Sequence, residues 1–157
     1  MMEQVNHPQH YNARPDGLEC IDIIRHYTFN IGCAIKYLWR AGLKGGDNST
    51  EQDLRKAIFY IEDELHLGIE LDEFADMTRE SFDDLQDMLK RMTGRDFQEV
   101  ANYEYYGEHL THAMSCLLHV GLVSDGRVYR VSYASHILRD AIAEIKTYIN
   151  ELKQTTL

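Results

Sequence analysis

Proline occurs only at the beginning of this chain, and that placement constrains the fold more than any other feature. Both prolines, Pro8 and Pro15, lie within the first fifteen of the 157 residues. Proline interrupts a helix because it has no backbone N–H, and it disfavours helix in the residue before it. We therefore expect an extended arm over residues 1–17, ending in the turn pair Asp16-Gly17, and a mainly helical remainder.

Apolar residues in the remainder recur with helical spacing. A short helix is expected over 18–27, followed by a helix that Asn30 caps and Gly42 ends. Further helices are expected over 49–68, 70–77, 79–92 with a stop at Gly94, and 134–153, with a capping box at Ser49. A second capping box at Asp96 opens a segment that leads into a long helix ending at Gly121. The core positions of the first helical hairpin are Ile31, Ala34, Ile35, Leu38, Trp39, Leu54, Ala57, Ile58, Ile61 and Leu65.

Strand character is confined to residues 123–133, where β-branched and aromatic residues surround Asp125-Gly126. A small hairpin and an ordered loop fit this segment equally well. The fold class that follows is all-α, a helical bundle of about six helices. We expect a single domain over 1–157, with the arm at 1–17, a hairpin region at 18–68 and a helical completion at 69–157.

The two ends of the helical region show a possible internal repeat. Ala34, Leu38 and Gly42 match Ala113, Leu117 and Gly121 at a constant offset, and the segment at 54–58 matches that at 138–142. A true repeat and the chance alignment of two amphipathic hairpins are both open. If the repeat is real, the second hairpin keeps the core stripe of the first hairpin and loses its polar edge. The changed pairs are Lys36 and Ser115, Arg40 and His119, Lys44 and Val123, Asp53 and Ile137, Lys56 and Asp140, and Tyr60 and Glu144.

Charge and composition exclude several classes of protein. The net charge of −10 disfavours a general nucleic-acid binder, because phosphate would be repelled. No apolar run approaches the length of a membrane span, and the first residues lack the features of a signal peptide. Three separated cysteines predict reduced thiols without a disulfide framework. Together these features predict a cytoplasmic protein.

Three cations cluster at the end of the first long helix. Lys36 and Arg40 are four residues apart and share one side of that helix, and Lys44 follows next to Gly45-Gly46. Arginine binds phosphate in a bidentate manner, lysine adds a point charge, and glycine lets the backbone approach a ligand closely. A phosphate site is one interpretation. The other is that the cations complement the helix dipole.

A second polar stripe lies on the following helix. Asp53, Lys56 and Tyr60 have the spacing i, i+3 and i+7, beside the core stripe. In an antiparallel hairpin this stripe can face Lys36 and Arg40. The alternative is a solvated edge with an internal ion pair.

The arm and the first short helix carry further candidates. His7, His10 and Tyr11 can contact a nucleotide or transfer a proton, or they can simply pack on the helices. Glu19 and Asp22 can hold Mg²⁺ or a sugar hydroxyl, or they can serve as partners of the helix dipole.

An acidic segment offers a different chemistry. Glu70, Glu73 and Asp76 recur every three residues, as in the magnesium-binding carboxylates of all-α nucleotide pyrophosphatases. A solvated acidic face fits the same pattern. The sequence contains no Gly-x-x-x-x-Gly-Lys-Ser/Thr phosphate loop, no dinucleotide fingerprint and no nucleophile elbow.

The order of these motifs resembles the phage nucleotide kinase-like family over about residues 5–65. The resemblance implies a phage-encoded protein of the host cytoplasm that transfers phosphate from a nucleoside triphosphate to a deoxynucleoside monophosphate without a Walker loop. It implies that His7, His10, Tyr11, Lys36, Arg40 and Lys44 contact the nucleotide, supported by Asp53, Lys56 and Tyr60. The motifs are Asn6-His7-Pro8-x-His10-Tyr11, Glu19-Cys20-Ile21-Asp22, Ala34-Ile35-Lys36-Tyr37-x-x-Arg40-Ala41-Gly42-x-Lys44, and Asp53-Leu54-x-Lys56-Ala57-x-x-Tyr60.

Three functional hypotheses follow from the sequence. The leading one is a nucleotide kinase in which His7, His10, Lys36 and Arg40 act on the reacting groups, with Mg²⁺ accompanying the nucleotide. The second is a non-catalytic phage protein that sequesters a nucleotide or binds a host protein. The third is a magnesium-dependent nucleotide pyrophosphatase. A homo-oligomer is expected in which a second subunit closes a shallow site.

Overall fold

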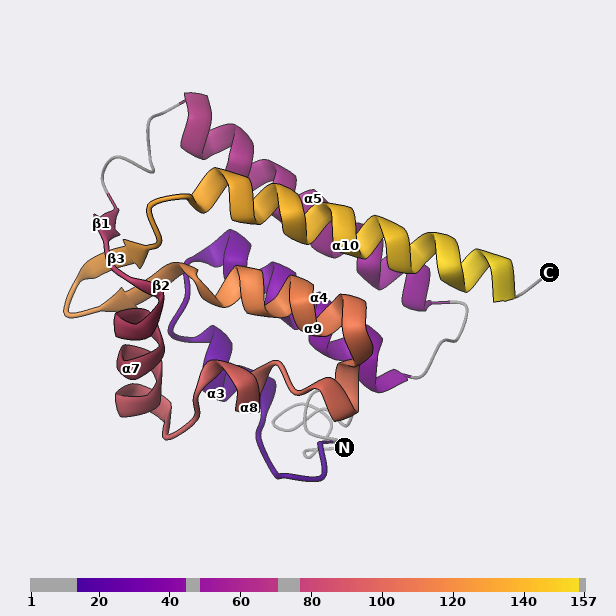
Figure 1. Ribbon diagram of the computed structural model, residues 1–157, viewed down its shortest axis with the longest axis horizontal. Coiled ribbons are helices and arrows are strands. Elements are labelled where there is room, and N and C mark those ends of the chain that lie inside the picture. Colours follow the sequence, from indigo (N-terminus) through magenta and orange to yellow (C-terminus); the bar gives the residue numbers. More distant parts are fainter. Residues whose placement is uncertain (1–13, 45–48, 71–76, 156–157) are drawn as a thin grey trace, which may run out of the picture.

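The computed structural model describes residues 14–44, 49–70 and 77–155, and its architecture confirms the predicted all-α helical bundle (Figure 1). A small sheet of short strands lies at one end of the helices. The described helices are α3 (Cys20–Ile24), α4 (Phe29–Lys44), α5 (Thr50–Glu70), α7 (Phe82–Thr93), α8 (Phe97–Val100), α9 (Tyr103–Leu118) and α10 (Ala134–Thr155), and the strands are β1 (Thr78–Arg79), β2 (Val120–Ser124) and β3 (Arg127–Arg130).

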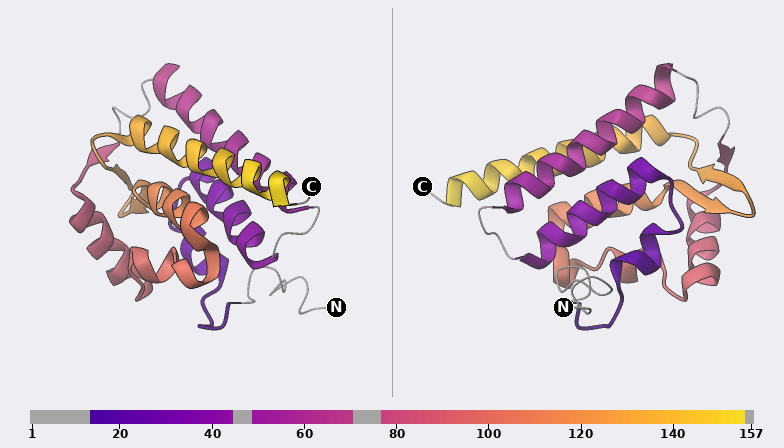
Figure 2. Two further views of the ribbon diagram at one scale, coloured as in Figure 1. Left: turned by 45° about the vertical axis from the view of Figure 1, so that its right-hand side comes forward. Right: turned by 180° about the vertical axis from the view of Figure 1, so that it is seen from behind.

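Four long helices form the centre of the molecule. Helix α4 packs against α5 and α9, and α10 packs against α9 and α5, so each of the four contacts two others. Figure 1 shows α5 and α10 running side by side over α4 and α9, and the rear view in Figure 2 brings α4 and α5 to the front. The apolar stripes predicted for the first hairpin are buried, and α9 and α10 supply the facing half of the core. Its fully buried members include Ile31, Leu38, Trp39, Leu54, Ile61, Leu110, Met114, Leu117, Leu138 and Ile145.

Two glycines that the sequence aligned with each other have different conformations. Gly42 does not end its helix as predicted, because α4 continues to Lys44. Its missing side chain instead makes room for a ring: a Cβ on Gly42 would lie 2.2 Å from Cδ1 of Tyr106. Gly121 lies in β2 with φ +83°, and a Cβ there would lie 2.4 Å from Oγ1 of Thr28. The first glycine serves helix packing, and the second serves a turn of the backbone beside Thr28.

Helix ends followed local capping rules at some places and tertiary contacts at others. The capping box of Asp96 and Glu99 is present at α8, and Gly94 ends α7 with φ 80°. Asn30, predicted as an N-cap, lies inside α4, which begins at Phe29. The helix expected from residue 79 begins at Phe82 behind the N-cap Ser81. The helix expected to end at Gly121 ends at Leu118, and Gly107 interrupts it with a non-helical conformation.

The segment with strand character forms a hairpin, and the hairpin links the two halves of the chain. Strands β2 and β3 pair antiparallel through a turn at Asp125-Gly126, and β1 pairs parallel to β3. The parallel strand β1 was not predicted. The N–H of Thr28 donates to the carbonyl of Gly121 at 2.8 Å, and the N–H of Val123 donates to the carbonyl of His26 at 2.7 Å. Strand β2 therefore fixes the connection between α3 and α4.

Within the described ranges, no helix combines the length and the apolar character that crossing a membrane requires.

Candidate functional site

An ion pair joins the two helices of the first hairpin. Nε of Arg40 on α4 lies 3.3 Å from Oδ2 of Asp53 in the first turn of α5. The Asp53 side chain is only 3% exposed, whereas that of Arg40 is 32% exposed. A carboxylate this deeply buried requires a positive partner, because burial of an unpaired charge is costly. Asp53 thus anchors Arg40 while part of the guanidinium remains at the surface.

One turn away, two lysines lie over the same aromatic ring. Nζ of Lys36 is 5.1 Å from the centre of the Tyr37 ring, and Nζ of Lys56 is 5.4 Å from it. The opposite helix contributes Tyr60, whose ring stacks on Tyr37 with centroids 5.9 Å apart and planes 10° apart. Each lysine gains a cation–π contact worth about 0.5–1 kcal/mol at an exposed site. The ring therefore holds two like charges close together.

We call the group of residues that these contacts join the α4–α5 seam: Lys36, Tyr37, Arg40, Asp53, Lys56 and Tyr60. Its geometry agrees with the predicted arrangement, in which the stripe on α5 faces Lys36 and Arg40. The seam carries three cations and one carboxylate, although the whole chain has a net charge of −10. A cationic surface on an acidic protein attracts anions locally and repels extended polyanions from the rest of the molecule.

Exposed aromatic side chains continue the seam towards the start of α4. The ring of Phe29 meets that of Tyr60 edge-on at 6.0 Å, and Phe59 meets Tyr60 at 5.3 Å. Phe29 is 75% exposed and Phe59 is 62% exposed. Beside them the side-chain amide of Asn30 donates to the carboxylate of Asp63 at 2.9 Å. The sequence analysis assigned Asn30 only as a helix cap, and it did not select Phe29 or Phe59, because exposed aromatic residues have no distinctive spacing.

The beginning of the described chain is fixed by a buried arginine that the sequence analysis also missed. The Arg14 side chain is fully buried and donates to the carbonyls of Val100 at 2.6 Å and Glu99 at 2.7 Å. Its guanidinium also lies 4.8 Å from the ring centres of both Trp39 and Tyr105. Arg14 therefore joins the start of the described chain to α4, α8 and α9.

Asp16 completes this anchor. Burial alone would raise the pKa of Asp16, but its hydrogen bonds from Arg14 and the Leu18 N–H, and the charges of Arg14 and Arg95, lower the pKa below its usual value. The anchor is therefore an ionised carboxylate held by two guanidiniums, the nearer at 2.7 Å. A single arginine in the sequence gave no signal for this arrangement, because the carbonyls that Arg14 binds, on Glu99 and Val100, are distant in the sequence.

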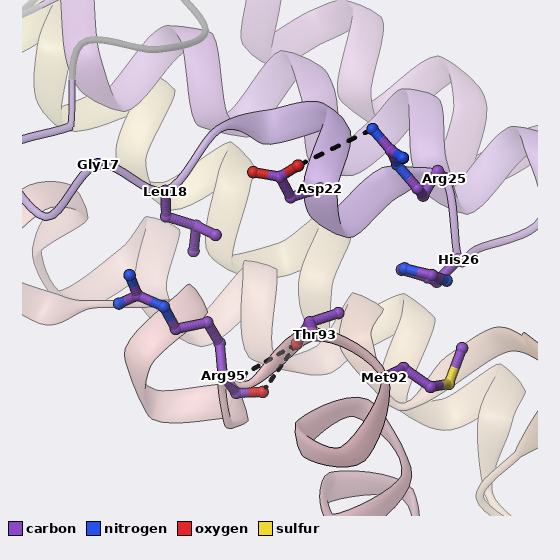
Figure 3. A pocket seen from close by; sticks show the side chains of 8 residues that line it. All are labelled: Gly17, Leu18, Asp22, Arg25, His26, Met92, Thr93 and Arg95. Atoms are coloured by element: carbon purple, nitrogen blue, oxygen red, sulfur yellow. Dashed lines mark hydrogen bonds and ion pairs between the residues drawn. The ribbon is translucent and has the colours of Figure 1, made fainter.

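The carboxylates proposed for magnesium have structural partners. Glu19 and Asp22 form the capping box of α3, in which the Glu19 N–H donates to Oδ2 of Asp22 at 3.3 Å. Asp22 also lies 3.8 Å from Arg25. Figure 3 shows Asp22 on the wall of a cavity of about 350 Å³ that Arg25, His26 and Arg95 also line. Burial, and then the charge of Arg25, lower the pKa of His26.

The capping box accounts for the i, i+3 spacing of Glu19 and Asp22, and magnesium binding by this pair stays a prediction. Among the described residues, no group of three or more His, Cys, Asp or Glu side chains is arranged to hold a metal.

Several predicted site residues lie outside the described residues. These are His7, His10 and Tyr11 in the arm, Gly45 and Gly46 in the loop after α4, and the acidic residues Glu73 and Asp76. The backbone of Lys44 forms the last residue of α4, and that of Glu70 forms the last residue of α5. Their predicted roles stay predictions.

Comparison with known proteins places the seam inside a family match. Residues 5–62 match a family model described as a protein of unknown function, DUF3310. The match includes α3, α4 and the part of α5 that carries Asp53, Lys56 and Tyr60. No curated protein and no solved structure matches the chain.

Proposed function

We propose that the α4–α5 seam binds the phosphate groups of a nucleotide and that the chain is a nucleotide kinase without a Walker loop. The observation that carries this proposal is that Lys36 and Lys56 come from two helices to the same Tyr37 ring, with Arg40 one helical turn further along α4. Like charges at such short range repel one another, so an anion lying between them is favoured. The resemblance of the same residues to the phage nucleotide kinase-like family supports phosphate as that anion.

The seam provides the charges that phosphoryl transfer needs. In the proposed reaction an oxygen of the deoxynucleoside monophosphate attacks the γ-phosphorus of a nucleoside triphosphate. The bond from that phosphorus to the β,γ-bridging oxygen breaks, and two nucleoside diphosphates form. Catalysis of such a transfer consists mainly of positioning and charge neutralisation. Arg40 would hold the transferring group, since Asp53 fixes its orientation, and Lys36 and Lys56 would neutralise flanking oxygens.

The remaining roles are assigned from the sequence. His7 and His10 would orient the acceptor or move a proton, and Lys44 with Gly45 and Gly46 would cover the phosphates. Mg²⁺ bound with the nucleotide would supply further charge neutralisation. A second subunit closing the seam would exclude water from the transfer.

Binding without turnover is the second candidate function. It is favoured by the fact that the six described seam residues, which carry the proposed phosphate contacts, all come from α4 and α5. A sequestering protein needs only the phosphate contacts, whereas a kinase also needs groups that orient the acceptor or move its proton.

The decisive experiment measures binding and products together. Calorimetric titration with deoxynucleoside mono- and triphosphates, with and without Mg²⁺, is compared between the natural protein, Arg40→Ala and Arg139→Ala. Arg139 is an exposed cation on α10 and serves as the control for charge. Loss of a charged hydrogen bond costs about 1.5–3 kcal/mol, so Arg40→Ala should bind more than tenfold weaker. Failure of any nucleotide to bind would overturn the proposal.

Product analysis then separates the enzymatic alternatives. A kinase yields diphosphates, a pyrophosphatase releases inorganic pyrophosphate, and a sequestering protein yields neither. Activity that survives Arg40→Ala but requires Glu73 or Asp76 would assign the chemistry to the acidic segment and not to the seam.

A further inference from the structure

We propose that a cavity between α3 and α4 holds the base and sugar of the nucleotide whose phosphates lie on the α4–α5 seam. This inference rests on the proposed function and adds to it a site for the nucleoside. The cavity has a volume of about 350 Å³, within the range of sites for small organic ligands. Its walls include Ile21, Ile24, Tyr27, Phe29, Cys33 and Lys36.

The lining of this cavity suits a flat aromatic ligand. Its lining includes two isoleucines and two aromatic residues, Ile21, Ile24, Tyr27 and Phe29, and Lys36 and Arg25 are its charged members. Phe29 is the most exposed large apolar side chain of the described residues, at 75%. An exposed ring next to an apolar cavity is a suitable stacking partner for a base, because stacking requires a π-face and no particular hydrogen-bond pattern. The cavity in Figure 3 differs, since polar and charged groups dominate its lining.

Two residues belong both to the cavity wall and to the edge of the seam. Lys36 lines the cavity while its Nζ lies 5.1 Å from the Tyr37 ring centre. Phe29 lines the cavity while its ring contacts Tyr60 at 6.0 Å. A ligand that fills the cavity therefore lies beside Lys36, the first of the seam cations along α4.

The spacing along α4 agrees with one extended ligand. From Gly32 in the cavity wall to Arg40 in the seam is eight residues, or about 12 Å along a helix. An apolar end and a highly charged end at that separation describe a nucleoside carrying phosphates. Free phosphate or pyrophosphate would use only the charged end.

The wall of the cavity is fixed before any ligand binds. Backbone hydrogen bonds from β2 hold His26 and Thr28, and the hydroxyl of Tyr27 donates to the carbonyl of Leu118 at 2.9 Å. Helices α3 and α4 also approach closely, since a Cβ on Gly32 would lie 3.3 Å from the carbonyl oxygen of Ile24. A rigid wall lowers the entropy cost of binding. The second half of the chain thus contributes to a site whose lining belongs to the first half.

A thiol in the wall permits a direct test. Cys33 is half-buried, whereas Cys20 and Cys116 are 2% and 5% exposed. Burial raises the pKa of Cys33, so alkylation is followed at mildly alkaline pH by mass spectrometry of the Cys33 peptide. At about ten times Kd only roughly a tenth of the protein is free, so a deoxynucleoside triphosphate should slow alkylation about tenfold. Inorganic tripolyphosphate at the same saturation should leave the rate within about twofold.

A variant pair tests the stacking partner. Phe29→Ala should weaken binding of a deoxynucleotide about tenfold or more and leave the affinity for tripolyphosphate unchanged. Tyr103→Ala, which removes another exposed ring that is 66% exposed, should change neither affinity. Far-ultraviolet circular dichroism confirms that each variant keeps its helical content.

The outcomes separate this inference from the function on which it rests. Protection of Cys33 by nucleotide but not by tripolyphosphate, together with the Phe29→Ala effect, supports a nucleoside pocket. Nucleotide binding that requires Arg40 but leaves Cys33 unprotected and tolerates Phe29→Ala overturns the pocket and keeps the phosphate site. Equal protection by tripolyphosphate also overturns the pocket. If neither compound binds, the proposed function fails and the pocket fails with it.

Discussion

The two helical hairpins share a core pattern but use their polar residues in opposite ways. In the α4–α5 hairpin, Lys36 and Lys56 lie over the ring of Tyr37, and Arg40 pairs with Asp53 while part of its side chain stays exposed. In the α9–α10 hairpin, the aligned position of Arg40 is His119, which is 3% exposed. The aligned position of Tyr60 is Glu144, which holds His109 at 2.7 Å. The first hairpin keeps three cationic side chains at least partly exposed, whereas these two aligned residues of the second hairpin form contacts within the fold.

His119 illustrates how the second hairpin uses a polar residue for folding. Its ring lies 4.3 Å from that of Phe82 and 4.8 Å from that of Phe97, and Nδ1 contacts the carbonyl of Ser115. Burial lowers the pKa of His119, although the contact with Ser115 opposes this effect. A neutral, buried imidazole joins α7, α8 and α9 and is unsuited to anion binding. The difference between the hairpins indicates that an anion site is to be expected on the α4–α5 hairpin and not at the aligned position of the α9–α10 hairpin.

The largest expected effect tests whether the two hairpins contribute equally to the core. Leu38 and Leu117 are aligned and both are fully buried. Leu38→Ala and Leu117→Ala should each lower the free energy of unfolding by about 2–5 kcal/mol, because both leave a cavity. Urea unfolding measures the two losses. A loss below about 1 kcal/mol for Leu117→Ala alone would show that the second hairpin is loosely packed.

A second prediction separates the two aligned glycines. Gly42→Ala should cost about 1–3 kcal/mol, because the new methyl group overlaps the Tyr106 ring. Gly121→Ala should cost a similar amount through the methyl contact with Thr28 and the left-handed backbone, itself worth roughly 1–2 kcal/mol.

Adding Tyr106→Leu distinguishes these mechanisms in the same unfolding assay. The smaller side chain should recover part of the Gly42→Ala loss and none of the Gly121→Ala loss. Equal recovery for both glycines would contradict the assigned contacts.

A third prediction replaces one residue of the α4–α5 hairpin with the residue at the aligned position of the α9–α10 hairpin. Lys36→Ser introduces the residue that stands at the aligned position of α9. Nucleotide affinity should fall about tenfold, the effect of losing one charged contact, and the unfolding free energy should change by less than about 1 kcal/mol. Lys146→Ser, at an exposed lysine on α10, should alter neither quantity. Calorimetry measures the nucleotide affinity, and urea unfolding of the same samples measures the stability. Equal losses of affinity in Lys36→Ser and Lys146→Ser would contradict a phosphate contact specific to the α4–α5 hairpin.

The smallest expected effect concerns pH and the second hairpin alone. Nδ1 of His109 lies 2.7 Å from Glu144 and Nε2 lies 3.0 Å from Glu151, and His112 lies 3.8 Å from Glu144. Both ring nitrogens can donate only when the imidazole is protonated. The hydrogen bond with Glu144 raises the pKa of His109, burial opposes it, and Glu151 raises it further.

The sign of the pH effect follows from that raised pKa. The stabilisation from His109 is fully present below the unfolded pKa of about 6.5 and is lost as pH rises through the folded pKa. His109→Gln should therefore destabilise the protein at about pH 5.5 and have little effect near pH 9. The lowered pKa of His119 makes its contribution to stability change with pH in the opposite direction. His119 is present in both the natural protein and the variant, so this contribution cancels in the difference between their unfolding free energies. If the unfolding free energies of the natural protein and His109→Gln differ by the same amount across this pH range, the proposed contribution of the His109 contacts with Glu144 and Glu151 is ruled out.

The core and most helices were predictable because their causes are local. The i, i+3, i+4 stripes of α4 and α5 are buried faces, as expected. The Asp96 capping box begins α8 and Gly94 ends α7, also as expected. The placement of Lys36 and Arg40 opposite Asp53, Lys56 and Tyr60 was also predictable, since a short connection forces the two helices to run antiparallel. The capping box of Glu19 and Asp22 is also local, but the sequence analysis did not predict it and gave these residues as candidates for Mg²⁺, a sugar hydroxyl or the helix dipole.

The missed features depend on residues that are distant in the sequence. Gly42 was expected to end a helix, but the ring of Tyr106 determines its role. Arg14 is buried among Trp39, Tyr105 and the carbonyls of α8, a set that no spacing rule connects. The strand β1 exists because β3 offers its edge.

The sequence alone therefore determined the helical class, the core stripes and the cationic and aromatic residue types of the seam, because side-chain periodicity and capping act within a few residues. Only the tertiary structure decided that Lys36 and Lys56 meet at Tyr37, that Phe29 and Cys33 line one cavity, and that β2 supports its wall. Those contacts arise from packing between elements, and packing energies depend on which surfaces meet in space.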